Sequence, residues 1–196
     1  MTADLRFKEI EHKFVVDEAF DLERLRAALA ALGPLRRSSI RVRDCYYLTA
    51  SGRDRRFILR HRYDDELHQL TVKAIGDDTE VRLEVNLDLG HRLGDQHEQV
   101  EAFVAQFGIE WSGALQKDLD VWDFPDCEVV HYRASTGTRS VRCVEFEATH
   151  KASVADALAT VHAYERATGF DSARRSRESL LQILFPEVTQ LLSAPP

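Results

Sequence analysis

The chain has 196 residues, of which 44% are hydrophobic and 30% are charged, and its formal net charge is −7. These values are typical of a folded protein, and the negative charge argues against a nucleic acid polymer as partner, which needs a basic surface. No apolar run approaches the ~20 residues of a membrane span, and no signal-peptide pattern is present, so we expect a cytoplasmic protein without membrane contacts. The three cysteines (Cys45, Cys127 and Cys143) lack metal-type spacing, so neither structural disulfides nor a zinc site are expected.

A strand is predicted over about residues 5–16, followed by a helix whose leucines, from Leu22 to Leu32, recur at spacings of three and four. Gly33 and Pro34 end this helix, because glycine suits its C-terminal cap and proline cannot continue its hydrogen bonding. Residues 36–86 then contain four predicted strands, separated by the turn signals SGRD, DDE and GDD.

The second half of the chain mixes strands with longer helices. A loop over residues 87–94 precedes a helix at about 95–107, and strands are predicted near 111–122, 127–134 and 139–149. A helix then runs from the capping pair Ser153 and Asp156 to Gly169, and a final helix covers about 173–191. Because adjacent strand pairings dominate, we expect one antiparallel α+β domain over residues 1–196, with its core at about 5–185.

Charged residues recur at every second position of several predicted strands. In EIEHKF, Glu9, Glu11 and Lys13 share one face of a strand, because successive side chains of a strand point to opposite faces. Similar spacing occurs in FILRHRY, LTVKA, EVRLEV and VEFEA, and a further base lies in the sixth strand. The residues concerned are Arg60, Arg62, Lys73, Glu80, Arg82, Glu84, Lys117, Glu145 and Glu147.

Two interpretations of this pattern are open. Each strand could simply present one face of a sheet to solvent, as antiparallel sheets often do. Alternatively, the strands could close into a barrel with a charged interior and an apolar exterior covered by helices. In that case the bases suit phosphate oxygens and the glutamates suit Mg²⁺ or Mn²⁺, so the interior would hold a polyphosphate together with metal ions.

EIEHKF resembles the ExExK signature of the CYTH domain, also called the triphosphate tunnel metalloenzyme family, and the charged motifs follow in the family's order from residue 9 to about residue 181. The family includes inorganic triphosphatases, thiamine triphosphatases and class IV adenylyl cyclases. The resemblance implies an eight-stranded antiparallel β-barrel that forms a tunnel, with helices packed outside.

The resemblance also implies roles for individual residues. Glu9, Glu11, Glu145 and Glu147 match metal-binding acids, and Glu84 belongs to the family's R-x-E motif and is expected to join them. The matches to substrate-binding positions are Lys13, Arg60, Arg62, Lys73, Arg82 and Lys117. Lys73 and Arg82 are also the expected catalytic residues, and Ser176 in RRSRESLL matches the family's C-terminal serine.

The sequence departs from the family pattern at three positions. Leu119 replaces the arginine of a K-x-R strand, which removes one phosphate contact and leaves affinity or substrate choice open. Asn86 stands where many members have a further glutamate, and Arg177 replaces an aromatic residue. The metal-binding acids are all present, which favours retained catalysis.

Outside these motifs, the eight histidines show no HExxH-type spacing. We expect His12 and His61 to point away from the barrel interior, since they alternate with motif residues. Glu80 is expected at the rim of the barrel or in solvent.

We therefore expect a Mg²⁺- or Mn²⁺-dependent enzyme that hydrolyses the terminal phosphate of tripolyphosphate or of a nucleoside or organic triphosphate. Its partner would be this small molecule, and the protein would be a monomer or homodimer. Class IV-type adenylyl cyclase activity is the alternative reaction, since the same site can align a ribose hydroxyl on the α-phosphate. A non-catalytic module that binds triphosphate or polyphosphate, and a plain structural barrel, are the alternatives without catalysis.

Overall fold

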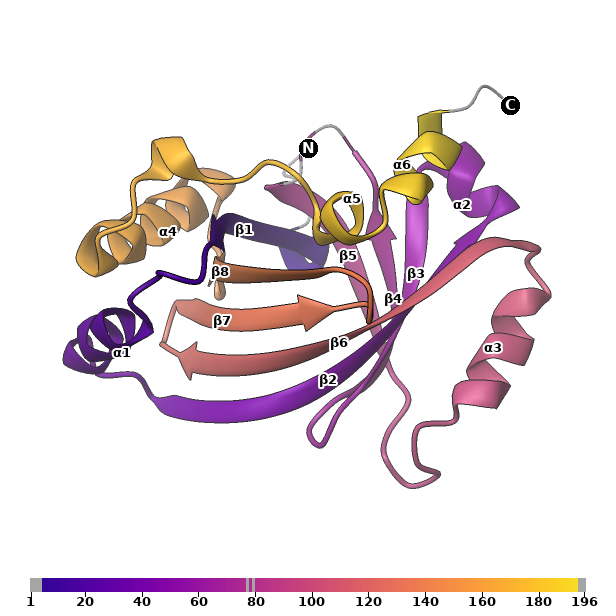
Figure 1. Cartoon of the computed structure of the whole chain (residues 1–196), viewed down its shortest axis with the longest axis horizontal. Coiled ribbons are helices and arrows are strands. Elements are labelled where there is room, and N and C mark those ends of the chain that lie inside the picture. Colours follow the sequence, from indigo (N-terminus) through magenta and orange to yellow (C-terminus); the bar gives the residue numbers. More distant parts are fainter. Residues whose placement is uncertain (1–4, 77, 79, 194–196) are drawn as a thin grey trace.

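A computed structural model describes residues 5–76, 78 and 80–193. Its centre is a closed barrel in which every neighbouring pair of strands is antiparallel, in the order β1-β5-β4-β3-β2-β6-β7-β8 (Figure 1). The strands are β1 (Lys8–Val16), β2 (Arg36–Thr49), β3 (Phe57–Tyr63), β4 (His68–Ala74), β5 (Val81–Asp88), β6 (Ile109–Asp123), β7 (Cys127–Ser135) and β8 (Ser140–Ala148). The predicted eight-stranded antiparallel barrel is confirmed.

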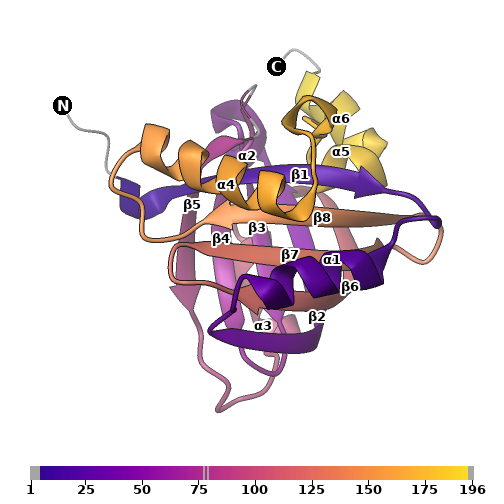
Figure 2. The ribbon, with the colours of Figure 1, turned by 90° about the vertical axis from the view of Figure 1, so that its left-hand side faces the viewer.

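The helices lie outside the barrel, as predicted. They are α1 (Leu22–Ala31), α2 (Ala50–Arg55), α3 (His97–Ala105), α4 (Val154–Thr168), α5 (Leu180–Leu184) and α6 (Pro186–Ser193), with short 3₁₀ segments η1 (Leu5–Phe7) and η2 (Ser172–Arg174). Figure 2 shows α1 and α4 lying across the outer face of the sheet formed by β1, β8 and β7. No helix within the described residues is long and apolar enough to span a bilayer.

A hydrophobic core lies between this outer sheet face and the two helices. Ile10 and Phe14 of β1 point outward and pack with Leu25 and Leu29 of α1 and Val161 of α4. Because side chains alternate along a strand, this outward packing turns the charged positions between them toward the barrel interior. The hydrophobic effect on one face thus fixes where the charges lie on the other.

Two predicted elements differ in the structure. The SGRD segment is a short helix, α2, rather than a turn; the Thr49 side chain caps its N-terminus, and Arg56 ends it in the left-handed region at φ 58°. The single final helix predicted over 173–191 is wrong, because α5 and α6 are separate helices. Ser179 and Gln182 form a capping box that starts α5, and Pro186 disfavours helical geometry at Phe185, where φ is −132°.

A close approach in α2 gives a stability prediction. A Cβ atom added at Gly52 would lie 2.6 Å from the carbonyl oxygen of Phe57, and this oxygen belongs to the backbone of β3 and cannot move aside freely. We expect Gly52→Ala to lower the free energy of unfolding by about 1–3 kcal/mol, as for other overpacked sites. Denaturant unfolding beside the exposed helix variant Ser51→Ala measures this, and equal stability of the two variants would contradict it.

Candidate active site

The barrel encloses a central cavity of about 460 Å³. All of the residues predicted for metal or substrate binding line this cavity: Glu9, Glu11, Lys13, Arg60, Arg62, Lys73, Arg82, Glu84, Lys117, Glu145 and Glu147. They come from six strands, β1, β3, β4, β5, β6 and β8, so the closure of the barrel is what brings them together.

Strand register places acids opposite bases inside the cavity. Glu9 of β1 is the cross-strand partner of Arg82 in β5, and Lys13 is the partner of Glu145 in β8. Lys73 in β4 faces a glutamate of β5 in the same way. Directly opposed residues of opposite charge attract each other across a strand pair, so the register itself supplies the first set of ion pairs.

One group of ion pairs centres on Arg82 and Lys73. The Arg82 guanidinium donates hydrogen bonds to both Glu9 and Glu11. The Lys73 ammonium lies 3.0 Å from Glu9 and 2.7 Å from Glu84, and Arg60 lies 3.0 Å from the same Glu84 carboxylate. Each of these acids therefore forms an ion pair with a base that also faces the cavity.

A second group of ion pairs involves Lys13, Arg62 and Lys117. The Lys13 ammonium is 3.2 Å from Glu145, and the Tyr132 hydroxyl donates a 2.7 Å hydrogen bond to the same carboxylate. Arg62 donates two hydrogen bonds, of 2.8 and 2.9 Å, to Asp44, and Lys117 lies 3.1 Å from that aspartate. Two cations are thus held by one fully buried carboxylate.

Burial and neighbouring charges shift the pKa values of the cavity carboxyl groups in opposite directions. Burial favours a raised pKa for Glu9, but Lys73 and Arg82 outweigh it and hold the pKa well below its usual value. For Glu147, burial and the nearby acids, Glu9 and Glu11 foremost, raise the pKa well above its usual value. The carboxyl of Glu147 lies among like charges and would gain most from a cation.

The carboxylates that could hold a metal are Glu9, Glu11 and Glu147; one oxygen atom from each lies within 4.8 Å of the other two. Carboxylate oxygens are the ligands that Mg²⁺ and Mn²⁺ prefer, so this donor set fits the predicted ion. The structure does not bring Glu84 and Glu145 into this group, because both face basic side chains instead.

Sequence reasoning missed three residues of the site. Asp44 is completely buried and binds Arg62 and Lys117, while Tyr132 and Glu128 line the cavity. Burial and the neighbouring Asp123 raise the pKa of Glu128 to about 7. The sequence could have indicated Asp44, because it lies at the same strand spacing as the apolar Val42 and Tyr46 of β2. An acid on such a buried face needs a basic partner.

The positions that depart from the family pattern lie in different surroundings. Leu119 lines the cavity and packs against an apolar cluster that includes Leu180 and Val130. Arg177 also lines the cavity. Asn86 accepts a 2.7 Å hydrogen bond from the Thr71 hydroxyl. Ser176 donates its backbone N–H to the Lys13 carbonyl at 2.7 Å, which ties the C-terminal segment to β1.

His61 lies on the outer side of β3, and it gives a prediction for how stability depends on pH. Burial, then His68 and His97, lower its pKa to about 4, and its Nε2 is 3.1 Å from Nε2 of His68. The unfolded chain takes up a proton at His61 near pH 6.5, whereas the folded protein does so only near pH 4. We expect stability to fall as pH drops through this window, by up to about 1.4 kcal/mol per pH unit from this residue.

Chemical denaturation of wild type and His61→Gln across the same pH range measures this contribution. The variant should show a shallower loss of stability than wild type. His150→Gln, at an exposed position, is the control and should follow wild type. Parallel curves for wild type and His61→Gln would contradict the prediction.

Comparisons with known proteins agree with the barrel fold. A CYTH domain model matches residues 8–117, and no curated protein matches the sequence. The PH1012 protein from Pyrococcus horikoshii OT3 has a TM-score of 0.70 at 17% identity, covering 90% of this chain and 99% of that chain. A conserved hypothetical protein from Pyrococcus furiosus has a TM-score of 0.67 at 22% identity, with the same coverage.

The HpAC1 protein from Hippeastrum is a more distant structural match. Its TM-score is 0.55 at 13% identity, and the alignment covers 96% of this chain and 98% of that chain. At such identities the matches show a shared fold. Since the family model matches more than half of the sequence, the chain belongs to the CYTH domain family.

Proposed function

We propose that this protein hydrolyses the terminal phosphate of tripolyphosphate, or of a nucleoside or organic triphosphate, in a reaction that depends on Mg²⁺ or Mn²⁺. The observation that carries the proposal is the central cavity, where the six predicted substrate-binding bases and a cluster of three carboxylates face the same enclosed space. Phosphoryl transfer needs this combination, because catalysis consists mainly of positioning and of stabilising negative charge.

The basic residues would bind the triphosphate by exchanging partners. Without substrate they pair with acids of the cavity, as Lys73 does with Glu9 and Glu84. Phosphate oxygens carry more charge than these carboxylates and suit the forked geometry of arginine. Lys73 and Arg82 would hold the phosphate that is transferred, while Lys13, Arg60, Arg62 and Lys117 hold the rest of the chain of phosphates.

The carboxylates Glu9, Glu11 and Glu147 would hold the metal, with Glu84 and Glu145 close by once their bases turn to phosphate. Bound there, Mg²⁺ or Mn²⁺ would neutralise phosphate charge and polarise the phosphoryl oxygens. Hydrolysis adds water across the terminal P–O–P bond, so that tripolyphosphate yields orthophosphate and pyrophosphate. Once the bases have turned to phosphate, the barrel would hold the bound phosphates in line for this reaction.

We propose further that residues 1–196 act as one domain. The family model ends at residue 117, but β7 and β8 close the barrel between β6 and β1. Glu145 and Glu147 on β8 complete the wall of the cavity. A chain truncated after residue 117 would lack both acids and would leave β1 without one of its two neighbours.

The Hippeastrum relative supports hydrolysis, since it is described as having a dominant triphosphatase activity. Adenylyl cyclase activity and binding without turnover are the competing functions. Phosphorus NMR of reactions with tripolyphosphate and with ATP distinguishes all three. We expect orthophosphate from at least one substrate, whereas cyclic AMP with pyrophosphate would establish a cyclase. Tight binding without products would establish a binding module.

A further inference from the structure

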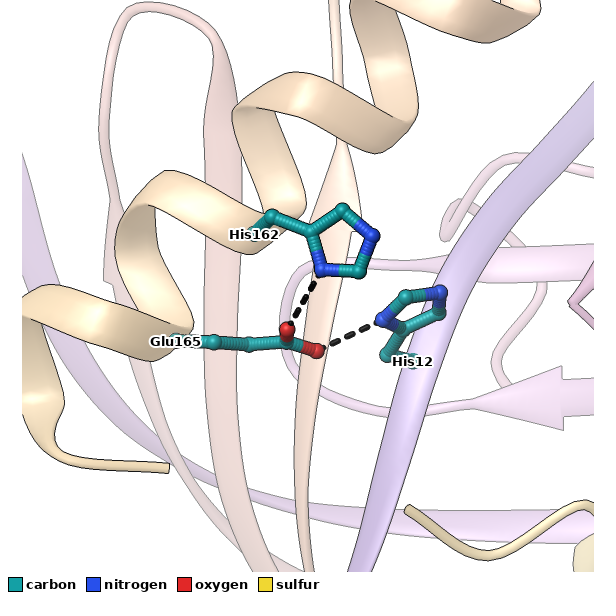
Figure 3. Close-up of side chains that lie close together, drawn as sticks. All are labelled: His12, His162 and Glu165. Carbon is teal, nitrogen blue, oxygen red and sulfur yellow. Dashed lines mark hydrogen bonds and ion pairs between the residues drawn. The ribbon is translucent and has the colours of Figure 1, made fainter. Parts of the chain in front are cut away.

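A second group of metal-ligand side chains lies outside the barrel, between β1 and α4. Figure 3 shows His12 of β1 facing His162 and Glu165, which lie one turn apart on α4. His12 and Glu165 are almost completely buried, while the His162 side chain is 36% exposed. This group could not be recognised in the sequence, because His12 lies about 150 positions before His162 and Glu165.

The contacts converge on the Glu165 carboxylate. His12 Nδ1 is 2.6 Å from Glu165 Oε1, and His162 Nδ1 is 2.9 Å from Oε2 (Figure 3). The Ser172 hydroxyl donates to the same carboxylate and lies 2.9 Å from His162 Nδ1. One ligand atom from each of the two histidines and the glutamate lies within 4.8 Å of the other two.

The hydrogen bonds of this group leave one buried nitrogen atom without a partner. Among the described residues, His12 Nε2 has no hydrogen-bond partner, although the side chain is only 1% exposed. The nearest carboxylate is that of Glu80, whose Oε2 lies 3.8 Å away and which is also held by Arg175. At 3.8 Å this carboxylate is too far away to accept a hydrogen bond from Nε2, so the ring is held by its Nδ1 side alone.

A metal ion on His12 Nδ1 accounts for this arrangement. The remaining proton then sits on Nε2 and points toward Glu80, which is the carboxylate–histidine–metal arrangement common in proteins. We propose that His12, His162 and Glu165 form a transition-metal site of the Zn²⁺ type, distinct from the carboxylate cluster in the central cavity. Two imidazole nitrogens and one carboxylate are a zinc donor set, and Ser172 or water would fill the fourth position.

Two of the three donor separations are shorter than those of a tetrahedral zinc site, and all three donors lie within 4.8 Å of one another. Donor atoms of a tetrahedral zinc site lie roughly 3.3 Å apart, given the usual metal–ligand distances. The observed separations of 2.6 and 2.9 Å are those of protons shared between nitrogen and oxygen, and the metal would replace these protons. The exposed edge of His162 gives the ion access, and the bound ion would tie α4 to β1.

Co²⁺ tests the site in the full-length protein after chelator treatment, because its visible absorption reports nitrogen ligands in tetrahedral geometry. We expect one Co²⁺ per chain to give a strong visible band that Zn²⁺ removes, whereas Co²⁺ held by the carboxylates of the central cavity would absorb only weakly. His162→Ala should weaken this binding by more than about 100-fold. The band should persist in Glu147→Gln, which alters the cavity cluster, and in His91→Ala, which removes a histidine elsewhere.

Equal Co²⁺ binding by wild type and His162→Ala would overturn the proposal, as would loss of the band in Glu147→Gln. X-ray absorption spectroscopy at the zinc edge needs only the wild-type protein, so it tests the proposal even when His162→Ala does not fold. A coordination shell with two imidazoles supports the site, and a shell of oxygen atoms only, or no bound zinc, overturns it. Neither result depends on triphosphatase activity.

Discussion

Glu147→Gln is expected to lower the metal-dependent hydrolysis of triphosphate by at least about 100-fold while leaving the folded protein as stable as wild type or more stable. The Glu147 carboxyl lies among acids that raise its pKa, and among the described residues it has no basic partner. An amide of the same size removes this repulsion but is a much poorer metal ligand. Phosphate release and thermal unfolding without metal measure the two effects.

Glu128→Gln is the matched control, because Glu128 is the cross-strand neighbour of Glu147 and lines the same cavity. It lies outside the cluster of three carboxylates, so its loss of activity should stay below tenfold. Activity in Glu147→Gln close to that of wild type would remove Glu147 from the metal site. Strong destabilisation of Glu147→Gln would show that its carboxylate has a partner.

Asp44→Ala is expected to have the largest effect on stability. The substitution leaves Arg62 and Lys117 buried without the carboxylate that holds them at 2.8–3.1 Å. Removing one partner of a buried ion pair costs about 3–5 kcal/mol, because the remaining charge stays desolvated. We expect this loss in denaturant unfolding, and we expect tripolyphosphate to restore part of it, since phosphate oxygens would replace the missing carboxylate.

Asp118→Ala is the surface counterpart of this variant. Asp118 accepts a 2.8 Å hydrogen bond from Arg41, but both side chains are exposed. Water screens an exposed pair, so this variant should unfold nearly as wild type does. If Asp44→Ala were no less stable than Asp118→Ala, the cavity would be more hydrated than its burial indicates. If tripolyphosphate protected both variants equally, Arg62 and Lys117 would not be its ligands.

The barrel and the cavity residues were predictable because alternation is a local property. Glu9, Glu11 and Lys13 must share a face wherever β1 lies, and the apolar Ile10 and Phe14 decide which face is inward. The partners of these residues were not predictable, because ion pairs follow from strand register. Asp44 binds Arg62 across β2 and β3, and nothing in either strand alone specifies that register.

The C-terminal segment shows how tertiary contacts override a local pattern. Residues 173–191 have helical periodicity, yet the Ser176 N–H pairs with the Lys13 carbonyl, which holds the chain extended beside β1. The helix can begin only after this contact, at the Ser179 cap. The pairing joins residues far apart in sequence, so no window of the sequence contains its signal.

Phosphate release from tripolyphosphate by wild type and Glu9→Gln, with and without Mg²⁺ or Mn²⁺, tests the central claim most directly. We predict release by the wild type only when a metal is added, and a loss of at least about 100-fold in the variant. Metal-independent release, or equal release by the two proteins, would contradict a catalytic metal site in the central cavity. No release by the wild type with either metal would contradict hydrolysis of this substrate.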